Sequence, residues 1–415
     1  MPGPLEKIRI LAQKFYKVGV MTSSWGPEEW QAIWNAVRTS TEVRGSQVPA
    51  LYRKTMKEFA VKNVWGTHRG ESAIFAALST LAPGNVIMPS YLCGNVIQAA
   101  RNAGHKAVLV DVDDHYNIDP SQALDAVNVD TRAIIVPSLY GRPAELQTIE
   151  RHCPAPVMLI DDAAQAWGAK HYGQAVGTFG DAGILSLGAK TITATSGGLL
   201  LQKKGGRHTA AFRQAVGQLS DQTRGRVLSR LADTALRYSY RTKAAPFLAL
   251  HHAAWRRFAP KKAEPYATLS NLDAALALAQ WPKVASINQR RTQNAHLLDD
   301  VLGRTTLTLP EKHSGHVYSK YIIRLPAREG RRTKPWAKLE RFIRHMAMRG
   351  VECERCYVPL HLKSGIQDWF VARRADLDVT ERLWWNSVAL PNHAELDEPT
   401  MHWIAQQVKD SLKNM

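Results

Sequence analysis

Two segments of this 415-residue chain contain residues whose types and order could support catalysis. The first reads IDDAAQAWG over residues 160–168 and places two adjacent carboxylates directly after an apolar run. The second reads SLGAKTITATSGG over residues 186–198, where small and hydroxyl-bearing residues surround Lys190. Partial burial would lower the pKa of this lysine and free its amine for Schiff-base chemistry. Both patterns also have an ordinary interpretation, since acids after strands often cap helices and loop lysines are usually solvated.

A third segment, GTHRGESAIFAAL at residues 66–78, is a glycine-containing loop that runs into a helix. The first N–H groups of a helix, together with its dipole, favour a bound phosphate. Most loops of this kind bind nothing, and Glu71 in the first turn would repel a phosphate unless its side chain points away. The segment therefore suggests a phosphate site without establishing one.

The surrounding pattern predicts the elements that would bring these segments together. Short apolar runs, separated by stretches of helical character, lie at residues 86–89, 107–112, 133–137 and 157–160. Continuous apolar runs spaced by helices are typical of a parallel sheet covered on both faces, which defines an α/β protein. Ligands bind such sheets at the carboxyl ends of the strands, so the residues after each run are the candidates for a site.

Beyond this sheet the sequence predicts further elements and three parts of the chain. A helix should begin at Pro27, a long helix near Leu269, a strand at 316–325, and helices at 336–348 and 398–412. We expect a large α/β domain with an N-terminal helical segment at 1–202, a basic helical insert at 203–265, and a smaller α+β domain at 266–415.

Together the segments resemble the DegT-type (DegT/DnrJ/StrS) sugar aminotransferases, which are fold-type I enzymes that use pyridoxal 5′-phosphate (PLP). That family typically shows SGTAAL at its first helix, HLYGxP before a middle helix, then EDAAQAxG and a lysine motif SFxxxKxITxGxGG. The counterparts here, with further similar stretches, lie at residues 69–74, 138–143, 161–168, 186–198, 271–280, 350–361 and 380–391. The resemblance covers most of residues 25–410 and implies a large mainly parallel-sheet domain that binds PLP and a smaller C-terminal α+β domain.

The resemblance also implies roles for particular residues. Lys190 would bind the cofactor covalently and then move the proton between substrate carbon and cofactor. Asp162 would pair with the pyridinium nitrogen, and Gln165 would hydrogen-bond the phenolic oxygen. Asp161 would be structural. Related dehydratases have a histidine in place of the lysine, so Lys190 favours amino transfer.

The same resemblance places the cofactor's phosphate and ring, and here the chain departs from the family pattern. Ser186 would hold the phosphate together with backbone N–H groups at Gly70, Glu71 and Ser72, although the family usually has threonine where this chain has Glu71. Where the family often stacks an aromatic residue on the ring, this chain reads PSYLC at 89–93, so either Cys93 takes that place or Tyr91 reaches over. The family's NxR motif, which reaches a neighbouring subunit, falls on YAT at 266–268.

The net charge of +18 is concentrated in one place. Residues 203–262 contain 14 Lys and Arg against two Asp, which gives +12 within the block where the family resemblance lapses. One interpretation is a helical insert whose apolar side packs on the protein and whose basic side is solvated. A second is contact with an anionic membrane surface, since cations flank the aromatic residues Trp255 and Phe258. A third is an anionic substrate, with nucleic acid an unlikely partner.

These observations lead to a functional expectation. We expect a cytoplasmic, homodimeric aminotransferase that moves an amino group from glutamate to a nucleotide-linked keto sugar. The alternatives are a PLP enzyme acting on a lipid-linked or amino-acid-derived carbonyl at the inner membrane face, and a non-catalytic regulatory or nucleic-acid-binding relative. No metal is expected, because the cysteine pair at 353 and 356 lacks the second pair of ligands that a zinc site needs. The first residues lack a secretory signal pattern, and no apolar run is long enough to span a bilayer.

Overall fold

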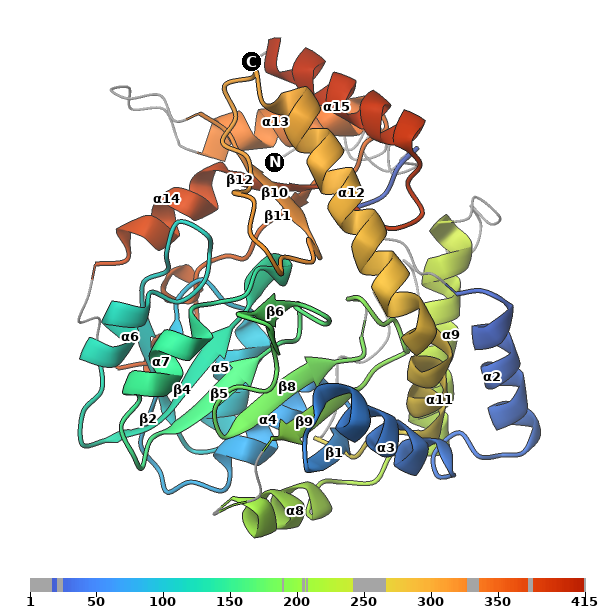
Figure 1. Ribbon diagram of the computed structural model, residues 1–415, viewed down its shortest axis with the longest axis vertical. Helices are drawn as coiled ribbons and strands as arrows, with labels where there is room; N and C mark the ends of the chain where they lie inside the picture. The colour runs from blue at the N-terminus through green and yellow to red at the C-terminus, as the bar shows by residue number, and fades with distance from the viewer. Residues whose placement is uncertain are drawn as a thin grey trace.

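Seven strands form the sheet on which the larger part of the molecule is built (Figure 1). The computed structural model describes residues 17–20, 25–188, 190–203, 206, 208–241, 266–326, 336–371 and 376–413. In spatial order the strands are β1 (Asn63–Thr67), β9 (Gly198–Gln202), β8 (Ala182–Ser186), β5 (Met158–Asp162), β4 (Thr131–Pro137), β2 (Asn85–Pro89) and β3 (Lys106–Val110).

The predicted parallel sheet is confirmed over most of its width. The pairs from β8 through β5, β4 and β2 to β3 are all parallel, whereas β9 runs antiparallel to both β8 and β1. The four predicted runs become β2, β3, β4 and β5 to within two residues at either end. The carboxyl ends of β4, β5 and β8 therefore meet at one edge, where the sequence predicts the site.

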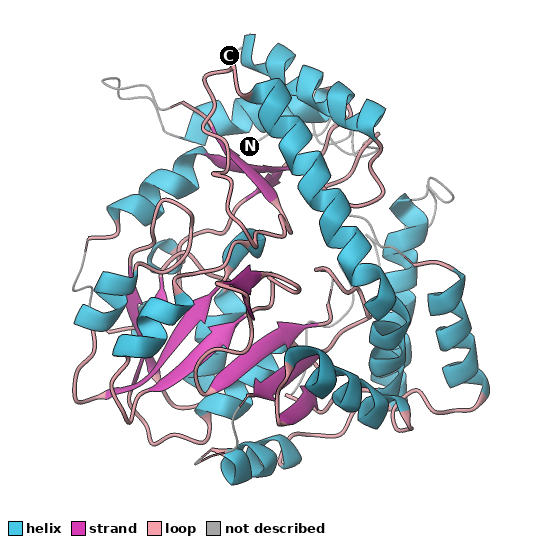
Figure 2. Ribbon diagram, viewed as in Figure 1, coloured by secondary structure: helices cyan, strands magenta, loops and turns pink. Residues whose placement is uncertain are grey.

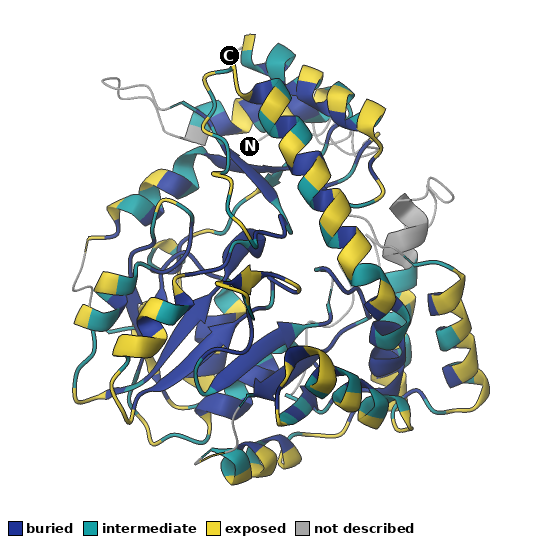
Figure 3. Cartoon of the chain, in the orientation of Figure 1, coloured by how far each residue is buried: buried dark blue, intermediate teal, exposed yellow. Residues whose placement is uncertain are grey.

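Both faces of the sheet are buried, which explains why its strands are continuously apolar (Figure 3). In β4, Ala133 and Ile135 pack into one hydrophobic cluster, and the alternating residues Ile134 and Val136 pack into the other. Helices that contribute to the first cluster are α4 (Gly70–Leu78), α5 (Gly94–Asn102) and α8 (Thr209–Gly217). Those that contribute to the second are α3 (Gln47–Phe59), α6 (Pro120–Asp125), α7 (Leu146–His152) and α11 (Asn271–Gln280).

A second, smaller sheet lies in the C-terminal part of the chain (Figure 2). Its antiparallel strands, in spatial order, are β10 (Tyr321–Arg324), β12 (Ser387–Leu390) and β11 (Glu354–Arg355). A hydrophobic cluster of its own joins it to α12 (Val284–Leu302), α13 (Trp336–Met348) and α15 (Glu398–Lys413), and α14 (Asp378–Asn386) leads into β12. This is the expected small α+β unit.

The remaining predicted elements differ from the structure in two places. The strand expected at 316–325 is confined to β10, because Tyr318 has a positive φ of 44° that interrupts extended backbone. The long helix expected from Leu269 is divided into α11 and α12 by a 3₁₀ turn (Trp281–Lys283) that contains Pro282. The helix α2 (Pro27–Arg38) begins at the predicted proline, and α13 and α15 match the predicted helices.

The described half of the basic block packs on the protein as the first of its three interpretations predicts. Within α9 (Arg224–Arg241), Val227 is buried and Leu231 is partly buried, whereas Arg224 and Arg226 are exposed. The aromatic part of the block, at residues 242–262, lies outside the described residues. Within the described chain, no helix is both long and apolar enough to cross a membrane.

The boundaries proposed for the three parts stay a prediction. The helix α11, which was assigned to the C-terminal part, packs against α2 and α3 of the N-terminal part.

The thiols of the pair Cys353 and Cys356 are free, and burial raises the pKa of both thiols. In the part of the chain that the structure describes, no group of three or more His, Cys, Asp or Glu side chains could hold a metal ion.

The reversed strand β9 passes so close to the start of α4 that it requires a glycine. A Cβ on Gly198 would lie within 2.5 Å of the backbone nitrogen of Gly70. We therefore expect Gly198→Ala to lower the free energy of unfolding by at least about 2 kcal/mol, because backbone cannot yield as a side chain can. Gly217→Ala, at the end of α8 where an added Cβ would meet open space, is the control and should not destabilise the protein. Equal urea midpoints for the two variants would contradict this close approach.

Candidate active site

A cavity of about 310 Å³ opens at the carboxyl edge of the large sheet. It brings together residues from the three sequence segments that could do chemistry, with β5, β8 and the start of α4 contributing to its wall. Of the residues proposed for the site, those on the cavity wall are Gly70, Glu71, Cys93, Asp162, Gln165, Ser186 and Lys190.

The two adjacent carboxylates of β5 lie in different surroundings, because successive side chains of a strand point to opposite faces of the sheet. Asp162 lines the cavity, and its Oδ1 accepts a hydrogen bond from the backbone N–H of Ala164 at 3.1 Å. Burial raises its pKa to about 6, against the opposing effects of that hydrogen bond and of the charge on Lys190. Asp161 is fully buried and accepts hydrogen bonds from the N–H groups of Gly177 and Phe179 at 2.5 and 3.2 Å. Asp161 therefore holds a turn, as its proposed structural role requires.

Lys190 lies in the loop between β8 and β9, and its surroundings favour the neutral amine. Burial lowers the pKa of this lysine, and the charge of Lys320 lowers it further, whereas Asp162 acts in the opposite direction. The backbone of the loop is held by Arg291 of α12, which donates to the carbonyl of Lys190 at 3.0 Å and to the hydroxyl of Thr191 at 3.1 Å. Arg291 was not found from the sequence, because it lies a hundred residues away in a helix of ordinary composition.

Gln165 is held between two tyrosines that the sequence did not single out. Its Nε2 donates to the hydroxyl of Tyr357 at 2.9 Å, and its Oε1 accepts from the backbone N–H of Tyr140 at 3.3 Å. Tyr357 itself lines the cavity. The glutamine side chain is therefore fixed in orientation beside Asp162 and Tyr357.

Tyr91 and Ser72 are not among the residues that line the cavity, and their proposed contacts with the cofactor stay predictions. Tyr91 is fully buried, with its hydroxyl 3.0 Å from that of Tyr140, whereas Cys93 two residues later faces the cavity. Ser72 points into the protein, where its hydroxyl lies 2.8 Å from Nδ1 of His68. Between the two residues proposed to stand over a bound ring, the structure thus favours Cys93.

The start of α4 supplies the cavity with a positive end. The helix begins at Gly70, and Arg69 just before it lines the cavity and lies 3.5 Å from the carboxylate of Glu71. This contact offsets the repulsion that Glu71 would otherwise exert on an anion. Ser186 lies beside Gly70, and its hydroxyl accepts a hydrogen bond from the N–H of Gly188 at 3.3 Å. Arg69, which the sequence did not single out, is thus a further cation at the proposed phosphate end.

The fold and this lysine-bearing cavity define a class, the fold-type I PLP-dependent transferases. A putative sugar aminotransferase from Streptococcus pneumoniae in its PLP form superposes with a TM-score of 0.76 at 17% identity, covering 96% of this chain and 99% of that one. The family model of the DegT/DnrJ/EryC1/StrS aminotransferases matches residues 24–409. The chain therefore belongs to the DegT/DnrJ/EryC1/StrS aminotransferase family, as its motifs predicted.

Two relatives at similar distance carry different names. A UDP-N-acetyl-3-dehydro-α-D-glucosamine 3-aminotransferase of Acidithiobacillus ferrooxidans is 27% identical over 384 residues, which cover 89% of this chain and 90% of that protein. A pleiotropic regulatory protein of Geobacillus stearothermophilus is 26% identical over 404 residues, which cover 92% of this chain and 94% of that protein. Relatives of this chain thus include a nucleotide-sugar aminotransferase.

The buried carboxyl group of Asp161 should make stability depend on pH. Burial raises its pKa to about 8, so the folded chain holds a proton there that the unfolded chain releases near pH 4. Because the folded state binds more protons between these values, this group's contribution to stability is lost as the pH rises toward 8. Asp161→Asn cannot lose that proton and should flatten the decline of the urea midpoint between about pH 5 and pH 8.5, measured at one protein concentration. An unchanged slope would contradict the raised pKa.

Proposed function

We propose that this chain uses PLP, held in the cavity around Lys190, to transfer an amino group from glutamate to the keto carbon of a nucleotide-linked sugar. The observation that carries the proposal is the shared cavity, in which one lysine of lowered pKa and one buried carboxylate from separate segments lie near a helix N-terminus. The Acidithiobacillus relative, named for a UDP-linked sugar, supports the substrate class.

The residues present fit PLP by their chemistry. The amine of Lys190 suits a bond to the cofactor's aldehyde, and the carboxylate of Asp162 suits its ring nitrogen. The N–H groups at the start of α4, together with Arg69 and Ser186, suit its phosphate. When bound, PLP supplies an electron sink for the carbon that loses a proton.

The protein's own groups would then control one proton and one charge. With the cofactor bound, Nζ of Lys190 would be the base that takes the proton from the substrate carbon and the acid that later gives it back. Burial lowers the pKa of this amine, which favours its unprotonated form relative to a solvated lysine. The Asp162 carboxylate would keep the ring nitrogen protonated. The hydrogen bond from Gln165 to Tyr357 keeps the Gln165 amide oriented.

The other proposals are less well supported by the described residues. A non-catalytic regulatory role is suggested by the name of the Geobacillus relative. A protein with that role would not need a cavity lined by Lys190 and Asp162. Membrane contact through residues 203–262, a lipid-linked or amino-acid-derived substrate, and the homodimer stay predictions.

Replacing the lysine tests the proposal directly. Purified protein supplied with PLP should absorb visible light, and Lys190→Ala should lose both this absorption and all transfer from glutamate. Lys170→Ala, at an exposed lysine outside the cavity, is the matched control and should behave as wild type. The protein that has taken up the amino group from glutamate is then mixed with nucleotide-linked keto sugars. The sugar that restores the visible absorption is the acceptor. A colourless wild-type protein that binds no PLP would refute the proposal.

The neighbouring aspartates give a second test with a built-in control. Asp162→Asn should slow the half-reaction with glutamate at least about 100-fold, because the ring nitrogen loses the group that keeps it protonated. Asp161→Asn should leave the rate within a few-fold, since Asp161 only holds the turn at Gly177. Stopped-flow absorbance measures both rates. Equal rates for the two variants would contradict the role of Asp162.

A further inference from the structure

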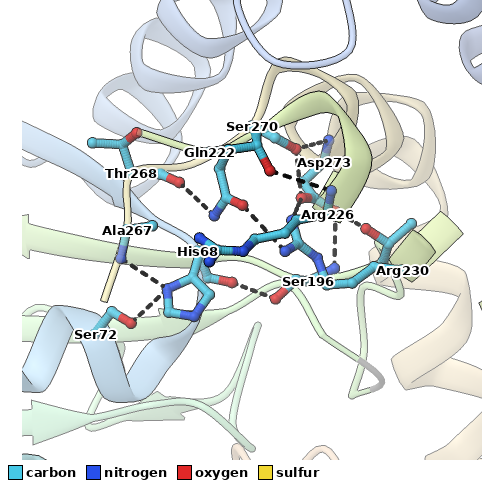
Figure 4. A network of polar contacts seen from close by, with 12 residues as sticks. His68, Ser72, Ser196, Gln222, Arg226, Arg230, Ala267, Thr268, Ser270 and Asp273 are labelled. Atoms are coloured by element: carbon cyan, nitrogen blue, oxygen red, sulfur yellow. Dashed lines mark hydrogen bonds and ion pairs between the residues drawn. The ribbon is translucent and has the colours of Figure 1, made fainter. Parts of the chain in front are cut away.

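A buried carboxylate outside the cavity fixes the end of the Lys190 loop (Figure 4). Asp273, near the start of α11, is fully buried. It accepts hydrogen bonds from the hydroxyl of Thr195 at 2.5 Å, the N–H of Ser196 at 2.8 Å and the hydroxyl of Ser270 at 2.6 Å. Thr195 and Ser196 line the cavity, so one carboxylate defines the position of that part of its wall.

The same network continues to the loop before α4, which forms the other side of the proposed phosphate end. The hydroxyl of Ser196 donates to the carbonyl of His68, and the N–H of Ala267 donates to Nδ1 of that histidine at 3.2 Å (Figure 4). His68 immediately precedes Arg69 and Gly70, which line the cavity. A shift of Asp273 would therefore move two sides of the cavity together.

Helix α9 of the basic block reaches into this network through one arginine. The guanidinium of Arg230 lies 3.6 Å from Oδ2 of Asp273, and its side chain is only 11% exposed. Its Nη1 also donates to Gln222, and the amide of Gln222 donates to the carbonyl of Thr268 at 3.1 Å (Figure 4). Arg213 of α8, in the same basic block, is exposed. Of these two arginines, Arg230 is the one that lies against the buried carboxylate.

A carboxylate as buried as Asp273 needs an opposite charge as well as hydrogen bonds, because desolvation of an ion costs several kcal/mol. Arg230 supplies that charge from the basic block at residues 203–262. Its influence extends to the proposed phosphate end, since burial and then the charges of Arg69, Arg230 and Arg226 lower the pKa of His68 to about 3. The neutral His68 can therefore keep Nδ1 as an acceptor for Ala267.

We propose that Arg230 is a positioning residue of the active site: by holding Asp273, it fixes the loop at residues 190–197 and the start of α4 in the arrangement that grips the cofactor's phosphate. The inference rests on the proposed function for the identity of the ligand. The basic block would then contribute a positioning residue to the site as well as positive charge to the surface.

Two arginines of the basic block give a matched test. Arg230→Met should weaken PLP binding at least 10-fold, measured by equilibrium dialysis of the purified protein, and Arg230→Lys should recover most of that loss. Arg213→Met removes the same charge from an exposed position of α8 in the same block and should change the affinity less than 2-fold. If Arg213→Met weakens binding as much as Arg230→Met, or if neither does, the proposal is overturned.

Hydrogen exchange separates this inference from the proposed function. In the cofactor-free protein, Arg230→Met should speed amide exchange in residues 190–198 while exchange in α15 stays as in wild type, and Arg213→Met should change neither. Unchanged exchange at 190–198 would overturn the positioning role whatever the ligand. If wild type binds no PLP but the exchange result is as expected, the proposed function fails and the positioning role of Arg230 stands.

Discussion

The structure depends on bringing a buried carboxylate and a buried amine into one cavity. Burial disfavours the charged form of both groups, since it raises the pKa of Asp162 and lowers the pKa of Lys190. Each group shifts the pKa of the other toward the charged form, so their proximity offsets part of the cost of burial. Because Asp162 ends β5 and Lys190 follows β8, the parallel pairing of these two strands is what holds the charges together.

Around this pair, other buried polar groups fix backbone segments. Asp161 holds the turn at Gly177, Arg291 holds the carbonyl of Lys190, and Asp273 holds Ser196. Each places an ionisable group where a hydrophobic side chain would pack with less desolvation cost. These groups fix the position and orientation of the backbone, because a hydrogen bond to a backbone group defines its position more narrowly than an apolar contact does. The cavity is thus built from a rigid sheet edge and from loops held at several points.

The sequence predicted the sheet and much of the cavity because these features are local. Strands buried on both faces show as apolar runs, and the segments around Asp162 and Lys190 follow or precede such runs directly. Arg291, Tyr357 and Arg230 were not predicted, because each reaches the site from a distant element and nothing in its neighbouring residues reports that contact. The direction of β9 was also missed, since an apolar run gives no sign of whether a strand is parallel or antiparallel. The shortened strand at β10 depended on the φ angle of a single tyrosine.

The reversal of β9 determines where this protein can change its length. Because β9 is antiparallel to β8, its end at Gln202 lies at the edge of the sheet opposite the cavity, and the chain passes from there into α8 beneath the sheet (Figure 1). Residues added or lost between Gln202 and α8 would lie away from the cavity wall, which makes this a tolerant point for evolutionary insertion and for grafting a reporter domain. The chain continues through α8 and α9, which both pack on the hydrophobic core, so any graft must preserve the positions of both helices.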